Sequence, residues 1–483
     1  MALVLGGSAA AKQIKLEAAM AEPVILAGEK KTTYLKVGLT GFEWAADERP
    51  PVNVAIVLDK SGSMGGEKIK RARDAAKMAI DRLGEDDIVS VITYDSTVKV
   101  VVPATKASDK GEIFKMIDAI RPGGNTALFA GVAKGALEVR KFLRKDLVNR
   151  VILLSDGIAN IGPSTPGALG ELGLSLSKEG ISVSTIGLGA DYNEDLMFAI
   201  AERSNGNHSF AESGKELAAI FDSEFGDVLS VVAQEVLVSI ECDPGVRPVK
   251  VLGREAEISG QVCTVLLNAL YSAQEKYVLL EVEVPASAAG KSRNVAKVAV
   301  SYANMATKVT DEMTSKVAVR FTETATEVVD NANRDVMVAS AIQVATLNNR
   351  KAMMLCDEGK IAQASELLLA NGAACNSAHM LWGSDELLQF AENNIIDAVN
   401  LEGPAYSGTR KAMRADQFRN IQQVWGRGYN SRHNEFYGAT KMSAEELKKY
   451  IEAQKQNLDK IDQIQLIPGY GEKGKAKSKG KGK

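Results

Sequence analysis

The positions of apolar residues along the chain change pattern three times. Between residues 50 and 227, short β-branched runs alternate with amphipathic stretches, and this cadence predicts a doubly wound, Rossmann-like α/β domain. Three of the runs are continuously apolar, as expected of strands covered by helices on both faces. The predicted strands span residues 52–59, 87–94, 97–103, 150–156, 182–189 and 207–212, with 87–94 and 97–103 forming an antiparallel pair. The predicted helices span residues 67–83, 109–120, 127–144, 166–178, 193–203 and 214–227.

The flanks of this domain follow a different period. Residues 31–42 and 234–321 alternate apolar and polar side chains with a period of two, which is typical of antiparallel strands in a β-sandwich. Chain termini often leave a domain close together. We therefore expect the two flanks to complete one sandwich, with the α/β domain inserted in it or flanked by it.

From residue 326 the apolar period becomes 3.6, which predicts helices. Residues 403–440 are rich in Gly, Tyr, Arg and Asn and predict an irregular loop, after which Ser443 and Glu446 form a capping box for a polar helix. The Gly/Lys-rich end predicts disorder. The expected segments are 1–48 (sandwich strands), 49–228 (α/β domain), 229–325 (sandwich), 326–402 (helices), 403–467 (loop and polar helix) and 468–483 (tail).

Composition narrows the class of protein. With 45% hydrophobic and 25% charged residues, the 483-residue chain is a typical globular protein. Its net charge of −3 divides into about −8 for the body and +5 for residues 471–483. The four cysteines form no CxxC motif, and the three histidines lack zinc-ligand spacing, so we expect free buried thiols and no structural zinc. With no apolar run of about 20 residues and no convincing leader, we expect a cytoplasmic protein, or a periplasmic or surface protein if a leader was removed.

The residues with candidate chemistry follow the first strand. Asp59, Ser61 and Ser63 form a D-x-S-x-S sequence at the carboxyl edge of the predicted sheet, where open α/β sheets bind ligands. A tight turn with glycine at position 62 can point both hydroxyls to the side of the carboxylate. Thr126, in the loop that precedes a helix, and Asp156, at the end of another apolar strand, are expected at the same edge.

Five oxygen donors without nitrogen or sulfur favour a hard cation, Mg²⁺ first, with Mn²⁺ and Ca²⁺ as alternatives. Only two of the five donors are charged, so the ion keeps positions open for an outside ligand. An Asp or Glu carboxylate of a partner protein would supply both the missing charge and a hard oxygen. A strand-to-helix turn capped by Asp and Ser would explain D-x-S-x-S alone, but not Thr126 and Asp156 as well.

With these residues the sequence resembles the von Willebrand factor type A family, whose metal-ion-dependent adhesion site is D-x-S-x-S plus a Thr and an Asp from later loops. Asp59, Ser61, Ser63, Thr126 and Asp156 match all five positions. The resemblance covers residues 50–227 and implies a Mg²⁺-dependent protein-binding module for adhesion or assembly. The flanking strands are also similar to those of bacterial members and of the inter-alpha-trypsin inhibitor heavy chains.

Two other functional classes remain beside this one. Bacterial members of the family resemble partners of MoxR-type AAA+ ATPases or of metal chelatases, so a non-catalytic subunit or adaptor of such a machine is the alternative. A metal-dependent hydrolase would need a general base near Asp59, and the sequence offers no candidate, so we expect no enzyme activity. We also expect no nucleic-acid partner.

Overall fold

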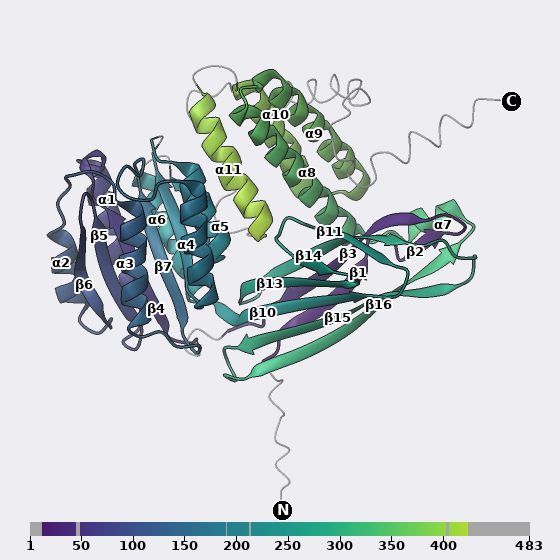
Figure 1. The fold of residues 1–483 in the computed structure, drawn as a ribbon, viewed down its shortest axis with the longest axis horizontal. Helices are drawn as coiled ribbons and strands as arrows, with labels where there is room; N and C mark the ends of the chain where they lie inside the picture. The colour runs from purple at the N-terminus through teal and green to yellow at the C-terminus, as the bar shows by residue number, and fades with distance from the viewer. Residues whose placement is uncertain (1–11, 45–48, 190, 212–213, 402–404, 424–483) are drawn as a thin grey trace, which may run out of the picture.

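The structure is a computed structural model that describes residues 12–44, 49–189, 191–211, 214–401 and 405–423 (Figure 1). It contains an α/β domain, a pair of β-sheets and a group of helices. The three parts are arranged around one another, with the sheet pair beside the α/β domain and the helices above both in this view.

The α/β domain is built on a six-stranded sheet with the strand order β6-β5-β4-β7-β8-β9. Neighbouring strands are parallel except β5 and β6, which are antiparallel as predicted. After β4 the chain adds β5 and β6 on one side of β4 within the sheet, and it then adds β7, β8 and β9 on the other side. The strand order therefore reverses between β4 and β7. Doubly wound sheets bind ligands at the carboxyl ends of such a strand pair. The strands are β4 (Val52–Asp59), β5 (Ile88–Tyr94), β6 (Val98–Lys106), β7 (Val148–Ser155), β8 (Ser182–Leu188) and β9 (His208–Ala211).

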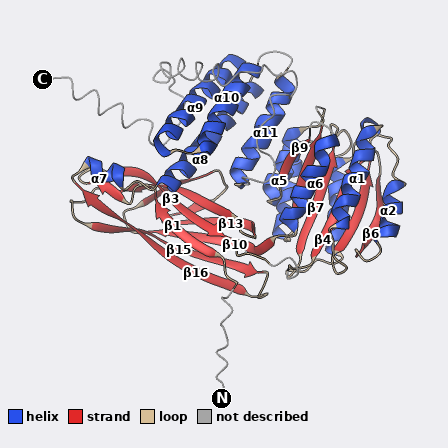
Figure 2. Cartoon of the chain, turned by 180° about the vertical axis from the view of Figure 1, so that it is seen from behind, coloured by secondary structure: helices blue, strands red, loops and turns tan. Residues whose placement is uncertain are grey.

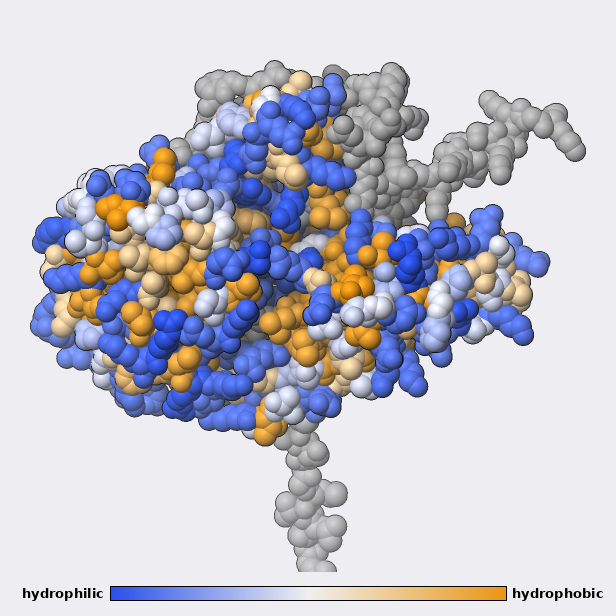
Figure 3. Space-filling model, viewed as in Figure 1, coloured by the Kyte–Doolittle hydropathy of each residue, from blue (hydrophilic) through white to orange (hydrophobic). Residues whose placement is uncertain are grey.

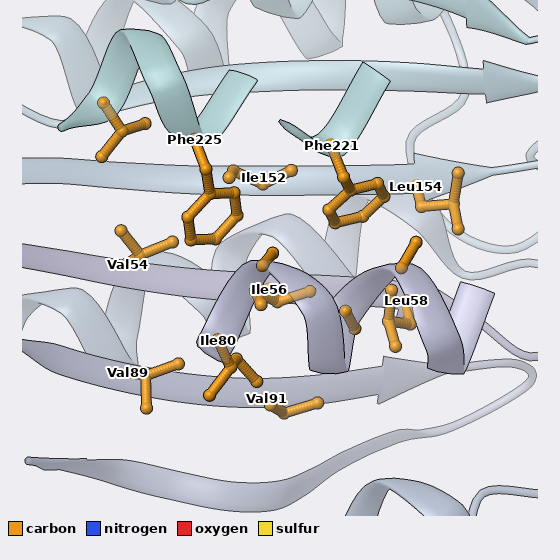
Figure 4. Packing of buried hydrophobic residues seen from close by; sticks show 14 of the residues in the cluster. Val54, Ile56, Leu58, Ile80, Val89, Val91, Ile152, Leu154, Phe221 and Phe225 are labelled. Carbon is orange, nitrogen blue, oxygen red and sulfur yellow. The ribbon is translucent and has the colours of Figure 1, made fainter. Parts of the chain in front are cut away.

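Helices cover both faces of this sheet because alternate side chains of each buried strand point to opposite faces. Ile56 and Leu58 of β4 pack in one cluster with Phe221 and Phe225 of α6 (Figure 4), whereas Val57 packs in a second cluster with α3. The helices are α1 (Glu67–Asp81), α2 (Lys110–Asp118), α3 (Leu128–Arg140), α4 (Pro166–Lys178), α5 (Glu194–Ser204) and α6 (Gly214–Val228), with a 3₁₀ turn, η1 (Gly62–Met64), before α1.

Two further sheets face each other across one apolar cluster. One has the order β1-β3-β14-β11 and the other β12-β13-β10-β15-β16-β2. β3 precedes the α/β domain and pairs antiparallel with β14, which follows it. Strands from both sides of the α/β domain therefore share the same sheets. Their bounds are β1 (Lys15–Met20), β2 (Val24–Leu26), β3 (Lys31–Thr40), β10 (Val231–Cys242), β11 (Arg247–Leu252), β12 (Glu257–Ser259), β13 (Val262–Tyr271), β14 (Glu275–Val284), β15 (Ser292–Asn304) and β16 (Thr310–Thr322).

The C-terminal helices pack on the outer face of the smaller sheet. Tyr277 and Leu279 of β14 point away from the sheet pair and join a cluster with apolar residues of α8, α9 and α10. The α/β class and the helical C-terminal region predicted from the sequence are confirmed. The helices are α7 (Ala325–Asp330), α8 (Arg334–Asp357), α9 (Ile361–Trp382), α10 (Asp385–Asn400) and α11 (Tyr406–Gln422).

The irregular loop predicted for residues 403–440 is wrong over 406–422, where the chain forms α11. This helix has no simple apolar stripe and is held by distant contacts. Its Phe418 packs edge-on against Phe198 of α5, with ring centroids 5.5 Å apart. Arg410 pairs with Asp195 of α5 and, across from it, with Asp357 of α8. Both views place α11 between the other helices and the α/β domain (Figure 2). The predicted polar helix from Ser443 and the tail lie outside the described residues.

The surface of the molecule mixes polar and apolar side chains. Over the face seen in Figure 3, hydrophobic residues are interspersed with hydrophilic ones on all three parts. Among the described helices, none combines the length and the apolar composition that a bilayer crossing requires.

Candidate metal centre

Two aspartates meet at the carboxyl edge of the α/β sheet, at its topological switch point. Asp59 is the last residue of β4, and Asp156 directly follows β7, the parallel neighbour of β4. Both side chains are wholly buried. Buried carboxylates are costly unless hydrogen bonds or a cation compensate their charge. Their surroundings therefore decide what this edge of the sheet can bind.

The turn after β4 directs two serine hydroxyls toward Asp156. The Ser61 backbone N–H donates to Oδ1 of Asp59 at 2.8 Å, which closes the turn on its own carboxylate. The hydroxyls of Ser61 and Ser63 lie 3.0 Å apart, and that of Ser63 donates to Oδ1 of Asp156 at 2.7 Å. A continuous hydrogen-bonded chain thus joins Asp59 to Asp156 through both serines.

The loop that carries Thr126 is tied to the same turn by backbone hydrogen bonds. The Gly62 N–H donates to the Gly124 carbonyl at 3.0 Å, and the Gly123 N–H donates to the Lys60 carbonyl at 2.7 Å. Gly124 has a φ of +81°, a conformation that favours glycine. The two loops therefore meet at the carboxyl edge of the sheet.

Gly157 shows how closely the hydroxyls converge. A Cβ placed on this glycine would lie 3.3 Å from Oγ1 of Thr126, 3.5 Å from Oγ of Ser63 and 4.0 Å from Oγ of Ser61. Thr126 is held there because its backbone N–H donates to Oδ1 of Asn160 at 2.9 Å. Three hydroxyls thus border one small space that a single methyl group would enter.

The structure brings all five sequence-predicted residues to this one place. The five are Asp59, Ser61, Ser63, Thr126 and Asp156.

The electrostatics of the edge favour a positive charge. Burial raises the pKa of Asp59, and the nearby charge of Asp156 raises it further. Hydrogen bonds from Ser61 and from the Ser155 hydroxyl, which donates to Oδ2 of Asp59 at 2.8 Å, act in the opposite direction. Burial and the Asp59 carboxylate also raise the pKa of the Tyr94 phenol beneath them well above its usual value. A cation at this edge would relieve the cost of holding both aspartates ionised.

The donor set fits a hard divalent cation. It consists of two carboxylates and three hydroxyls, the oxygen ligands that Mg²⁺, Mn²⁺ and Ca²⁺ accept. Within the described parts of the chain, no three His, Cys, Asp or Glu side chains are grouped as metal ligands. Any ion at the edge therefore depends on the serine and threonine hydroxyls as well as on the two aspartates.

Four residues that shape this edge were not predicted from the sequence. Ser155 and Gly157 flank Asp156. Their position next to an aspartate at the end of a strand is a sequence signal that could have identified them. Asn160 holds Thr126 from a loop that has no local pattern. Lys68, in the first turn of α1, places its ammonium nitrogen 2.6 Å from Oδ2 of Asp156, and nothing in the sequence distinguishes it from the other lysines of that helix.

These observations define the class of protein. It contains a doubly wound α/β domain whose sheet carries a group of oxygen donors at its topological switch point. Residues 53–223 match the family model of the von Willebrand factor type A domain. The chain therefore contains a von Willebrand factor type A domain, as the D-x-S-x-S resemblance implied. Domains of this family are commonly metal-dependent protein-interaction modules, and most are not catalytic.

The curated relatives align mainly over this domain. The uncharacterized Escherichia coli protein YfbK is 30% identical over 217 residues, which cover 44% of this chain and 38% of that protein. The uncharacterized Synechocystis protein sll0103 is 32% identical over 244 residues, which cover 48% of this chain and 57% of that protein. The chain thus spans about half the length of these relatives. The expected likeness to inter-alpha-trypsin inhibitor heavy chains is also found, with human heavy chain H2 27% identical over 171 residues, 34% of this chain and 18% of that protein.

Solved structures extend the likeness of fold beyond the α/β domain. A von Willebrand factor type A protein from Catenulispora acidiphila superposes with a TM-score of 0.61 over 77% of this chain and 89% of that chain, at 17% identity. The ArnB paralog VWA2 from Sulfolobus acidocaldarius superposes with a TM-score of 0.57 over 85% of this chain and 99% of that chain, at 16% identity. At such identities the likeness shows the fold.

Proposed function

We propose that this chain is a Mg²⁺-dependent, non-catalytic protein-binding module that serves adhesion or assembly. Asp59, Ser61, Ser63, Thr126 and Asp156 hold the ion, with Mn²⁺ and Ca²⁺ as alternatives. An Asp or Glu carboxylate of a partner protein completes the metal shell. Domains of this family are commonly metal-dependent interaction modules, which supports the general class.

The convergence of the five oxygen donors carries the proposal. The hydroxyls of Ser61, Ser63 and Thr126 border the space beside Gly157, and Ser63 already bonds to Asp156. A purely structural turn would need only the hydrogen bond from the Ser61 N–H to Asp59. It would not need a threonine hydroxyl from a separate loop at the same point.

The charge and exposure of the edge support an acidic partner. Two carboxylates are few ligands for a dication, so a bound ion supplies a Lewis-acidic position for an outside oxygen. Ser63 is an exposed residue of the turn, so a partner can reach this position. Ile158, two residues after Asp156, exposes 62% of its surface. An apolar side chain beside an acidic ligand group is a favourable contact for a protein partner.

The test begins with the ion alone. We expect Mg²⁺ and Mn²⁺ to bind the purified chain at one site in calorimetric titrations, and Asp59→Ala to abolish that heat. Asp86→Ala is the matched control, because Asp86 is an exposed carboxylate of the same domain that pairs with Lys106. Titrations in which Asp59→Ala and the natural chain behave alike would reject the proposed site.

The second stage asks whether the ion mediates partner binding. The chain is used as bait with Mg²⁺, with EDTA and as the Asp59→Ala variant. We expect a partner that is retained only by the natural chain in Mg²⁺. A partner retained equally in all three conditions would reject the metal bridge. If the captured partner is an AAA+ ATPase, the module belongs to the alternative class of machine subunits.

We also propose that the module works in the cytoplasm. Its four cysteines are buried free thiols, which fits a reducing compartment. A thiol titration of the protein isolated from its source without reductant tests this location. Four free thiols are expected, and a disulfide among them would contradict it.

A further inference from the structure

Lys68 is the cation that the fold itself provides to the candidate metal centre. Its ammonium nitrogen lies 2.6 Å from Oδ2 of Asp156, and the other oxygen of that carboxylate accepts from Ser63. We infer that Lys68 is a built-in counter-ion: it neutralises Asp156 when no metal is bound and lowers the affinity of the centre for divalent ions. This inference rests on the proposed metal centre and concerns its regulation.

No other basic side chain takes this role in the part of the chain that the structure describes. Asp59 has its oxygens engaged by the Ser61 N–H and the Ser155 hydroxyl, both of them neutral donors. Lys60, inside the D-x-S-x-S turn, pairs with Asp95 instead. The positive charge that reaches the two aspartates is therefore that of Lys68.

The two members of the pair differ in their access to solvent. Asp156 is wholly buried, whereas one third of the Lys68 side chain is exposed. Its ammonium group lies over Gly189, where an added Cβ would sit 3.6 Å from the nitrogen. A lysine on the rim can turn its charged end into water while its stem stays in place. The carboxylate cannot leave, so the lysine is the partner that can move.

Charge explains why the lysine and a metal ion compete. Both are attracted to the same buried carboxylate, and they repel each other at close range, where effective dielectric constants are far below that of water. Binding a divalent ion therefore requires the ammonium to move outward or to remain as a repelling neighbour. Either outcome reduces the affinity of the centre for the ion, and the centre stays stable without metal.

The experiment compares three variants of the full chain by calorimetric titration with Mn²⁺. Lys68→Met removes the charge and keeps an apolar stem, Lys68→Arg keeps the charge, and Lys70→Met is the control. Lys70 is an exposed lysine of the same helix, and its ammonium nitrogen lies 3.6 Å from Oε1 of the exposed Glu67. We expect Lys68→Met to bind Mn²⁺ about tenfold more tightly, because the loss of a nearby unit charge removes repulsion, and the other two to match the natural chain.

A second measurement, thermal unfolding in EDTA, checks the counter-ion role without any metal. Lys68→Met should lower the melting temperature by about 2–4 °C, since Asp156 then has no cation, and added Mn²⁺ should remove the difference. Unchanged or weaker Mn²⁺ binding by Lys68→Met, with normal binding by the natural chain, overturns the inference and leaves the metal centre in place. If the natural chain binds no divalent ion at all, it is the proposed function that fails.

Discussion

Buried carboxylates lie at both ends of the six-stranded sheet, in different surroundings. At the carboxyl edge, Asp59 and Asp156 are compensated by neutral donors and by one lysine that is itself one third exposed. At the amino edge, Glu224 of α6 pairs with Arg150 of β7 at 2.8 Å, and their side chains are only 5% and 2% exposed.

The amino edge satisfies its charges almost completely. Ser184 donates to the same oxygen of Glu224 that Arg150 contacts, and Asn207 donates to the other at 2.9 Å. Arg150 also donates to the Ser182 hydroxyl at 3.1 Å and to the Tyr271 hydroxyl at 3.3 Å. Because Tyr271 belongs to β13, this network fixes the α/β domain to the sheet pair.

The difference separates two uses of a buried charge. Where a buried charge has buried partners that fully compensate it, the charge stabilises the fold. Removing one partner then leaves the other uncompensated. Where compensation is incomplete and open to solvent, the charge is available to an external ligand. The two ends of one sheet thus combine a closed charge network with an edge where Asp156 pairs with a single, partly exposed lysine.

The largest expected effect is at the amino edge. Arg150→Met should lower the free energy of unfolding by about 3–5 kcal/mol, because Glu224 is left buried without its cation. The loss should be the same with EDTA and with Mg²⁺ in urea-induced unfolding. Arg140→Met is the control, since the Arg140–Glu179 pair is about one third exposed on each side and should contribute less than about 1 kcal/mol. Equal effects of the two variants would remove the contrast between the edges.

A smaller effect on stability, but a large one on binding, is expected at the carboxyl edge. Asp59→Asn should weaken Mn²⁺ binding at least about 100-fold, since even residues that only support metal ligands change affinity by about 10–100-fold. In EDTA its free energy of unfolding should equal or exceed that of the natural chain, because burial already raises the pKa of Asp59 and penalises its charge. Calorimetry and urea unfolding measure the two quantities. A marked loss of stability in EDTA would assign Asp59 a structural role like that of Glu224.

The smallest expected effect concerns His208, a buried imidazole that forms no salt bridge with any residue that the structure describes. Its Nδ1 lies 2.8 Å from the Thr185 hydroxyl, and burial, assisted by Arg414 and opposed by Asp195, lowers its pKa to about 3. The unfolded chain binds this proton near pH 6.5 and the folded chain does not. Neutral, buried His208 therefore makes its full contribution to the free energy of unfolding above about pH 6.5. Below that pH the free energy of unfolding falls as the pH drops toward 3, by up to about 1.4 kcal/mol per pH unit.

Urea unfolding at pH 7.5 and pH 5 measures this dependence. His208→Phe keeps an aromatic ring between Phe198 and Phe418, and it should reduce the loss between the two pH values by about 2 kcal/mol. Arg140→Met, which alters only a pair that is about one third exposed on each side, should show the same pH dependence as the natural chain. A slope unchanged by His208→Phe would show that this histidine takes up its proton without unfolding.

Much of the fold could be predicted from local sequence patterns. The continuous apolar runs that include Ile56 and Ile152 predicted buried parallel strands, and the α/β class is confirmed. Three of the candidate oxygen donors could be predicted for a similar reason, since Asp59, Ser61 and Ser63 lie within one turn. Thr126 and Asp156 could be added only because parallel strands end at a common edge.

Other features depend on residues that are far apart in the sequence. α11 was predicted as a loop because Arg410 and Phe418 follow no simple helical period, and the helix is selected by contacts with α5 and α8. Lys68 resembles any lysine at the start of a helix until α1 places it beside Asp156. The sequence around Arg150 similarly does not indicate that this residue forms an ion pair with Glu224 of α6.

The sequence by itself determined most of the strands and helices, though not α11, and which oxygen donors follow the strands, because periodicity and turn chemistry depend on near neighbours. Tertiary structure alone decided which charges meet. That choice separates the edge where Asp156 contacts a partly exposed lysine from the edge where Glu224 is paired with the buried Arg150. Burial and ion pairing act through space, so the same residue types form an open centre at one end of the sheet and a closed network at the other.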